Sequence, residues 1–443
     1  MILPEMIKLE ELKHNQMYDY DKIMDYEALY LGGDLFRQRK ENFLIKRHSD
    51  EKYPSQWKER LSRAGYINRA GGIIDWIAAA VFYDRPTYEV SDTATDETRA
   101  YWEGLNEDAD GLGHPISDIL TRCLVNMLVH KRSYLTAKFE SERGRLVDGS
   151  LNAYIDLFNP VEIVDWQHDN GKLEWCRRDG MESMRSADKQ WAMSSDVRKT
   201  WTFYDDETIN TYEAIYKNGQ RPEFAQLIES IAHDFGMPIF EVYSHCGQWV
   251  MDRIYDVAVA LFNRDSSATK YLDDGAFQLI VLSLEEGRSM GDLFLKDIAG
   301  IRLNIGESLA LTAPQSGYYQ PLQSDREYLK ASLFEVMQST AINAASIPQA
   351  GRMSGETVNN MREPLKVLLA SLAYPIYDAW NRITKALLEH RGEPEDSVEL
   401  KGFGEFVANM EEMEEVINGS EESGIERTDE DGGDEESEEN PDD

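Results

Sequence analysis

The order of the elements predicted after residue 248 restricts the possible folds of this 443-residue chain more than any other feature. A first amphipathic helix is predicted over 250–272, because its apolar residues recur at three- and four-residue spacing. These residues are Val250, Ile254, Val257, Leu261, Ala268 and Leu272. Charged residues such as Asp252 and Arg264 lie off this stripe, so we expect one face of the helix to pack and the other to meet water.

A small β insert and a second helix are predicted next. The runs 276–284 and 300–313 are rich in residues that favour strands and are joined by a glycine-rich connection. The second helix is predicted to begin at Ser324, with Glu327 completing a capping box. It should end before Pro348, because proline disfavours helical geometry in the residue that precedes it.

A short loop then leads into a long helix. The loop 348–355 contains two glycines and a single charged residue, Arg352. Helix is predicted from Glu356 to about Arg391, and Pro375 in its middle should kink it. The apolar stripe of this helix comprises Met361, Leu365, Leu368, Leu372, Ile376, Trp380, Ile383 and Leu387.

The part of the chain before residue 248 contains two segments with different hydrophobic periodicity. Residues 1–130 have helical periodicity, and the segment 66–83 places Ile67, Ile74 and Val81 on one predicted core face. Residues 131–245 change to short β-like runs separated by turn residues. These runs are Arg132–Glu140, Val161–Trp166, Thr200–Tyr204, Thr208–Tyr216 and Pro238–Tyr243. The fold class predicted from both segments is α+β.

The charge of the chain is strongly negative and concentrated at the end. The sequence holds 46 Lys and Arg against 82 Asp and Glu, a formal charge of −36, which argues against a general DNA-coating protein. Residues 393–443 contain 22 Asp and Glu but only Lys401 and Arg427 as cations. We interpret the segment from about Glu411 as a disordered acidic tail, which either keeps the chain soluble or docks a basic partner.

Motifs for catalysis are weak. Gly287, Ser289 and Gly291 form a literal G-x-S-x-G, but three fixed positions match readily by chance and only His390 follows the serine. The eight histidines show no metal-ligand spacing, and neither glycine-rich nucleotide-binding motif is present. We therefore expect no enzyme activity, no cofactor and no metal.

Cysteine content and hydropathy bear on the compartment. Three widely separated cysteines cannot form a disulfide framework and fit a reducing cytoplasm. The start of the sequence lacks a signal-peptide pattern. The longest apolar run, 73–82, is well short of the roughly 20 residues that cross a bilayer. The expectation is a soluble protein made inside the cell, without membrane contact.

Three stretches of the sequence resemble the portal proteins of tailed bacteriophages. The first is 53–86, with a tyrosine, an Arg-rich helix and a Phe followed by Pro at its end. The second continues it with the motif 110–113 (Asp-Gly-Leu-Gly) and with 159–166. The third is the series of helix, insert, helix, loop and long helix over 250–392. The resemblance covers nearly the whole chain, although its motifs consist of apolar spacing and turn residues.

This resemblance implies a portal fold with wing, stem, clip and crown. It implies a ring, usually of twelve subunits, at one vertex of the capsid, through which double-stranded DNA is packaged and later ejected. The implied division is 1–248 wing, 249–273 first stem helix, 274–322 clip, 323–346 second stem helix, 347–356 tunnel loop, 357–400 crown-directed helix and 401–443 acidic tail.

The resemblance also implies partners and a location. A portal docks the large subunit of the terminase motor, contacts the major capsid protein or a scaffold, and receives a head-completion adaptor. The chain would then lie in the virion at the portal vertex, and in the host cytoplasm during assembly.

Three groups of residues are the expected functional positions. Gln349, Arg352 and Met353 of the loop are expected to touch DNA, although Arg352 could equally be an ordinary surface residue. Charges on the second stem helix are expected to face the bore or a neighbouring stem; they are Arg326, Lys330 and Glu335. An apolar and aromatic set is expected at subunit or terminase contacts, or in the clip core: Phe294, Leu295, Tyr318 and Tyr319.

Two other functions stay open at this stage. One is a non-catalytic scaffolding or interaction protein that has the same α+β fold and acidic tail but forms no closed ring. The other is a serine hydrolase that uses Ser289 as nucleophile.

Overall fold

The structure is a computed structural model. It describes residues 19–46, 52–139, 141–142, 145–146, 153–169, 171–185, 193–220, 222–233, 235–244, 249–276, 279–283, 308–312, 319–335 and 355–403.

The first part of the described chain is helical, as the sequence predicts. Side chains cap several helices, and Asn68 Oδ1 accepts a hydrogen bond of 2.8 Å from the Gly71 amide at the start of α6. Ile74 and Val81 are fully buried, whereas Ile67 precedes the cap and is 56% exposed, so its predicted place in the core was wrong. The helices are α2 Tyr20–Leu31, α3 Gly33–Phe43, α5 Pro54–Arg63, α6 Arg69–Val81, α7 Asp96–Glu107 and α8 Ile116–His130.

Two antiparallel sheets follow. In the three-stranded sheet, β2 (Arg132–Phe139) lies between β11 (Ile239–Tyr243) and β5 (Ala153–Phe158). The five-stranded sheet has the order β10-β9-β8-β7-β6, so that its consecutive strands are neighbours. Its strands are β6 Ile163–Asp169, β7 Lys172–Arg185, β8 Met193–Tyr204, β9 Thr208–Tyr216 and β10 Gln226–Ala232.

Smaller elements complete the sheet region. A 3-10 turn, η1 (Pro160–Glu162), precedes β6, so residues 161–162 of the predicted strand are not extended. The strands β3 (Ser141–Glu142) and β4 (Arg145–Leu146) pair with each other.

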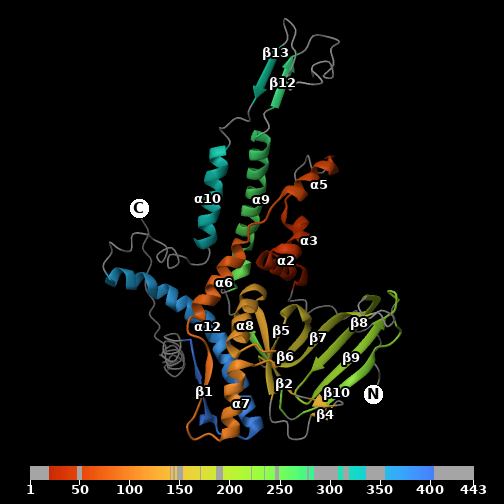
Figure 1. Cartoon of the computed structure of the whole chain (residues 1–443), viewed down its shortest axis with the longest axis vertical. Helices are drawn as coiled ribbons and strands as arrows, with labels where there is room; N and C mark the ends of the chain where they lie inside the picture. The colour runs from red at the N-terminus through yellow and green to blue at the C-terminus, as the bar shows by residue number, and fades with distance from the viewer. Residues whose placement is uncertain are drawn as a thin grey trace, which may run out of the picture.

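A helix pair stands away from this body. Figure 1 shows α9 (Val250–Ala276) and α10 (Tyr319–Glu335) side by side, with the strands β12 (Leu279–Ser283) and β13 (Ser308–Thr312) at the far end. β12 and β13 are antiparallel. We call α9 and α10 the projecting pair. The predicted order of helix, β insert and helix is confirmed.

Two details of the projecting pair differ from the sequence prediction. The second helix begins at Tyr319, so Ser324 is not its N-cap; Pro321 is tolerated in the first turn, where an amide needs no intrahelical acceptor. Leu272 was predicted on the packed face, but it is 53% exposed near the end of α9 that lies furthest from the body.

The last long helix, α12 (Gly355–Arg391), continues through Pro375 as one element. Gly392, with a φ of 65°, ends it in the left-handed conformation that glycine adopts without penalty. The 3-10 turn η5 (Glu395–Ser397) then leads to β14 (Val398–Lys401), which pairs with β1 (Thr87–Val90). Residues 398–400 are therefore a strand, although they were expected to belong to the crown-directed helix 357–400.

The main core lies where these helices meet. α12 contributes fully buried side chains at the predicted stripe positions Leu372, Ile376, Trp380, Ile383 and Leu387. α8 supplies residues such as Leu124 and Met127, which are also fully buried. α12 contacts α6, α8, β2 and β11, so it joins the helical layer to the three-stranded sheet.

Candidate functional site

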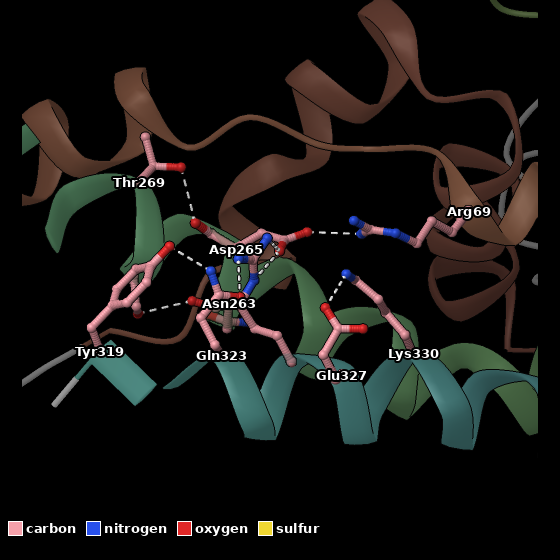
Figure 2. A network of polar contacts seen from close by, with 10 residues as sticks. Arg69, Asn263, Asp265, Thr269, Tyr319, Gln323, Glu327 and Lys330 are labelled. Atoms are coloured by element: carbon pink, nitrogen blue, oxygen red, sulfur yellow. Dashed lines mark hydrogen bonds and ion pairs between the residues drawn. The ribbon is translucent and has the colours of Figure 1, made fainter. Parts of the chain in front are cut away.

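Asp265 of α9 is the centre of a polar cluster where the projecting pair meets the body. Its Oδ1 lies 2.8 Å from Arg326 Nε and 2.7 Å from Arg326 Nη2 on α10, and its Oδ2 lies 2.8 Å from Arg69 Nη1 on α6. The Asp265 side chain is only 8% exposed, and the two arginine side chains are 18% and 26% exposed. Figure 2 shows Asp265 and Arg69 of this cluster, with Gln323 on the neighbouring α10.

The ion pairs of Asp265 fix how α6, α9 and α10 lie relative to one another. A buried carboxylate is costly unless hydrogen-bonded cations compensate it, and here two guanidinium groups do so. Because each arginine comes from a different helix, the carboxylate holds α9, α6 and α10 in a fixed relation. We call Arg69, Asn263, Asp265, Gln323 and Arg326 the polar seam.

Asn263 extends the polar seam to α3. Its Nδ2 donates to the Phe43 carbonyl at 2.8 Å, and its Oδ1 accepts from the Ile45 amide at 3.0 Å. Phe43 is the last residue of α3, so the asparagine satisfies backbone groups that the end of that helix leaves free. The body therefore contacts α9 at two positions two residues apart, Asn263 and Asp265.

On α10 the network continues within the helix. Arg326 Nη1 donates to Gln323 Oε1 at 3.0 Å, and Gln323 Nε2 donates to the Tyr319 hydroxyl. A separate ion pair joins Arg264 of α9 to Asp325 of α10; its side chains are 54% and 40% exposed. The pair of helices is thus joined by a buried network and by a more exposed ion pair.

The expected stem charges have different surroundings. Arg326 lies in the polar seam, while Lys330 Nζ pairs with Glu327 Oε1 at 2.6 Å within α10. Glu335 is the last residue of α10, and its side chain lies outside the described residues. Whether any of them faces a bore stays a prediction.

The other expected positions are only partly covered by the structure. Tyr319 begins α10, where its hydroxyl accepts a hydrogen bond from Gln323. The remaining expected positions lie outside the described residues; they are Ser289, Phe294, Leu295, Tyr318, Gln349, Arg352 and Met353.

A second anchor lies near the start of α9. Asp252 accepts a hydrogen bond of 2.9 Å from Lys22 Nζ and another from the Tyr26 hydroxyl, both on α2. Partial burial alone would raise the pKa of Asp252, but these two hydrogen bonds hold it below its ordinary value. Burial and then the bond to Asp252 raise the pKa of Tyr26. The phenol therefore stays protonated and donates.

The Asp-Gly-Leu-Gly motif at 110–113 has a structural role. The Asp110 carboxylate accepts from the Leu112 amide at 2.9 Å and contacts His114 Nδ1 at 2.7 Å. Its side chain is 3% exposed. The two bonds link residues of the turn that precedes α8 and stabilise it.

The described residues offer little for catalysis or metal binding. No group of three or more His, Cys, Asp or Glu among them could hold a metal ion. Burial raises the pKa of the Cys123 thiol to about 12, which leaves it unreactive as a nucleophile. Within the same residues no helix is both long enough and apolar enough to span a bilayer.

Asp252 and Asp265 were both missed as site residues. A signal for Asp265 is present in the sequence, since it falls four residues after Leu261 and three before Ala268, on the apolar stripe of α9. A carboxylate in such a stripe indicates a buried ion pair. Its partner Arg69 is 196 residues away, and no local pattern could have identified it.

Comparison with known proteins gives only distant likenesses. No protein-family model matches the sequence, and no curated protein matches it. One similar structure is a chain from the virion of a native gene transfer agent particle, with a TM-score of 0.40, 12% identity and coverage of 80% of this chain and 86% of that chain. Another is a chain from the neck of an empty gene transfer agent particle, with a TM-score of 0.41, 12% identity and coverage of 81% and 88%. At this level of similarity they establish no family for this chain.

Proposed function

We propose that this chain is the subunit of a ring-shaped portal of twelve copies at one capsid vertex, through which double-stranded DNA is packaged and ejected. The observation that carries the proposal is the projecting pair, which stands away from an α+β body with β12 and β13 at its far end. In the portal resemblance these parts correspond to stem, wing and clip.

A ring would bury large apolar side chains that are exposed on the projecting pair of a single chain. Tyr328 on α10 is 67% exposed and Leu272 on α9 is 53% exposed, although both are large and apolar. In a ring closed by heterologous contacts, α10 of one copy would cover α9 of the next.

The charges of α10 suit a channel for DNA. A conduit for a polyanion of any sequence must bind it weakly, because every phosphate that a cation neutralises adds affinity. Arg326 and Lys330 are both paired with carboxylates of the same chain, and the net charge is −36. DNA contact is therefore assigned to the loop residues Gln349, Arg352 and Met353, with Arg352 as the cation.

The rest of the proposal follows from this placement. The clip, with Phe294, Leu295 and Tyr318, would meet the large terminase subunit and the head-completion adaptor. The body would contact the major capsid protein or a scaffold. The subunit would have no catalytic role and would occupy the portal vertex of the virion, after assembly in the host cytoplasm.

Gold labelling of assembled particles tests the proposal against a scaffolding role. The full chain carries an affinity tag at its C-terminus, and particles that incorporate it are imaged after binding of a gold reagent. The expected result is a single gold cluster at one vertex, with about twelve copies of the chain per particle by quantitative mass spectrometry. Gold spread over the shell, or a much larger copy number, would indicate a scaffold instead.

A further inference from the structure

A cavity of about 730 Å³ lies between α12 and the strands β6, β7 and β11, apart from the polar seam. Its walls are largely apolar, with Leu173, Met237, Ile239 and Tyr374 among the lining side chains. A volume of this size accepts several side chains or a small ligand. We propose that the segment 404–417 of the same chain binds this cavity.

The cavity carries fixed cations. Arg132 lies 2.9 Å from Glu241, and its guanidinium lies over the Trp166 ring, 4.3 Å from the ring centroid. Arg382 Nη2 donates to the Glu241 carbonyl at 3.0 Å and pairs with Asp378 at 2.9 Å. These bonds orient both guanidinium groups before anything enters the cavity.

The charge balance of the cavity is unusual for this chain. Lys172, at the exposed turn of the β6–β7 hairpin, adds a third cation to Arg132 and Arg382. The carboxylates of the lining are Glu241 and Asp378, and His168 Nε2 lies 2.7 Å from Glu241. Three cations against two carboxylates make the lining positive by one charge, not counting His168, in a chain of net charge −36. An acidic segment would therefore be attracted to it.

The segment 404–417 has the matching composition. It contains five glutamates and no Lys or Arg. Its apolar residues Phe406, Met410, Met413 and Ile417 are spaced by four, three and four positions, as on one face of a helix. One face could enter the apolar part of the cavity while the glutamates approach its cations.

The described chain ends against α12, whose residues Tyr374, Asp378 and Arg382 line the cavity from another face of the same helix. Phe403 is fully buried, and its ring centroid lies 6.0 Å from that of Tyr377 on α12. Tyr377 is next in sequence to Asp378, which lines the cavity. Each extended residue spans about 3.3–3.6 Å, so the segment 404–417 is long enough to pass around a helix of about 10–12 Å diameter and reach the cavity from the same chain.

Photo-crosslinking in the full-length chain tests this binding. The photoreactive amino acid p-benzoylphenylalanine replaces Met410, the chain is irradiated, and crosslinked peptides are identified by mass spectrometry. The expected crosslinks join the probe to 372–382 of α12 or to 237–243. The same probe at Glu436 serves as the control and should give few crosslinks to these peptides. An absence of cavity crosslinks from position 410, or equal yields from both positions, would overturn the proposal.

Charge reversal tests the electrostatic part. Lys172→Glu should reduce the yield of the cavity crosslinks about two- to five-fold, the scale expected for one exposed ion pair. Lys58→Glu, on exposed α5, is the matched control and should leave the yield unchanged. Adding Glu411→Lys and Glu412→Lys to the Lys172→Glu chain should restore the yield. Equal yields in all variants would contradict a role for these charges.

Isotope mixing distinguishes the same chain from a second copy. Chains labelled with ¹⁵N and unlabelled chains are mixed before assembly and then irradiated. Crosslinks only within labelled or within unlabelled chains support the proposal. Crosslinked peptides that combine both labels would assign the segment to a neighbouring copy and overturn it. The result is independent of ring formation, so it stands or fails separately from the portal function.

Discussion

Arg326 of α10 and Asp265 of α9 form an ion pair of 2.7 Å between the two helices of the projecting pair, and Arg69 of α6 binds the other oxygen of the same carboxylate. One aspartate thereby fixes the orientation of two helices relative to the body (Figure 2). In a ring of copies this orientation would set the tilt of the projecting helices and hence the shape of the channel.

Loss of the central carboxylate should destabilise the chain. Asp265→Asn leaves two partly buried guanidinium groups without their counter-charge. We expect the free energy of unfolding to fall by about 3 kcal/mol, the low end for a broken buried ion pair, because the arginines are 18% and 26% exposed. Asp325→Asn, which breaks the more exposed pair with Arg264, should cost less than about 1 kcal/mol. Equal losses in denaturant titrations would contradict this role of Asp265.

The anchor at the start of α9 should make stability depend on acid. The pKa of Asp252 is below its ordinary value of 3.8 in the folded chain. Its contribution is therefore present above the unfolded pKa and is lost as the pH falls through the lower folded pKa. Tyr26→Phe removes one donor and keeps the ring, so it should lower stability at pH 7 by about 1 kcal/mol and flatten the decline below about pH 4. Melting curves against pH measure both effects, and an unchanged acid slope would exclude this contribution.

Glu393 should hold the end of α12 to α7. Its carboxylate accepts bonds of 2.8 Å from Trp102 Nε1, 2.9 Å from Thr98 Oγ1 and 2.9 Å from Arg391 Nε. Glu393→Ala removes the acceptor of all three bonds, and we expect the free energy of unfolding to fall by about 2–3 kcal/mol. Glu395→Ala, at an exposed position two residues on, is the control and should be near neutral. Denaturation followed by Trp fluorescence compares the two variants; a neutral Glu393→Ala would contradict the assignment.

The hydrolase alternative has a direct test. Ser289→Ala should leave stability and assembly unchanged, and an activity-based serine probe should not label the unmodified chain. Labelling of the unmodified chain that is lost in Ser289→Ala would support the serine hydrolase hypothesis.

The loop cation has its own prediction. In particles, Arg352→Glu should shorten the packaged DNA or slow its ejection, because a ring of acidic groups would repel phosphate. Gel analysis of packaged DNA length measures the first effect. Unchanged packaging and ejection would remove this loop from the mechanism.

Periodic segments were predicted well from the sequence. The buried stripes of α9 and α12 follow 3.6-residue spacing, and β9 has the predicted bounds. β7 (Lys172–Arg185) was not predicted, because charged residues such as Arg177, Arg178 and Glu182 obscure any alternation; pairing with β6 and β8 places it in the sheet. β14 was not predicted either, because the strand that pairs with it, β1, lies some 300 residues earlier in the sequence.

The candidate site was less predictable than the fold. Arg326 was identified as a stem charge, but its bond to Asp265 depends on how α9 and α10 are set side by side. Sequence periodicity defines the face of a helix and not the partner that another segment brings to it. Tertiary packing therefore decided which charges are buried in the polar seam.

The native mass of the full chain, with images of the particles, tests the central claim most directly. Protein released from assembled particles is measured by light scattering coupled to size exclusion and viewed in negative stain. We expect a ring with a central hole and a mass of about 610 kDa, corresponding to twelve chains of 50.8 kDa. A 50.8 kDa monomer from such particles, or an assembly without a hole, would contradict it.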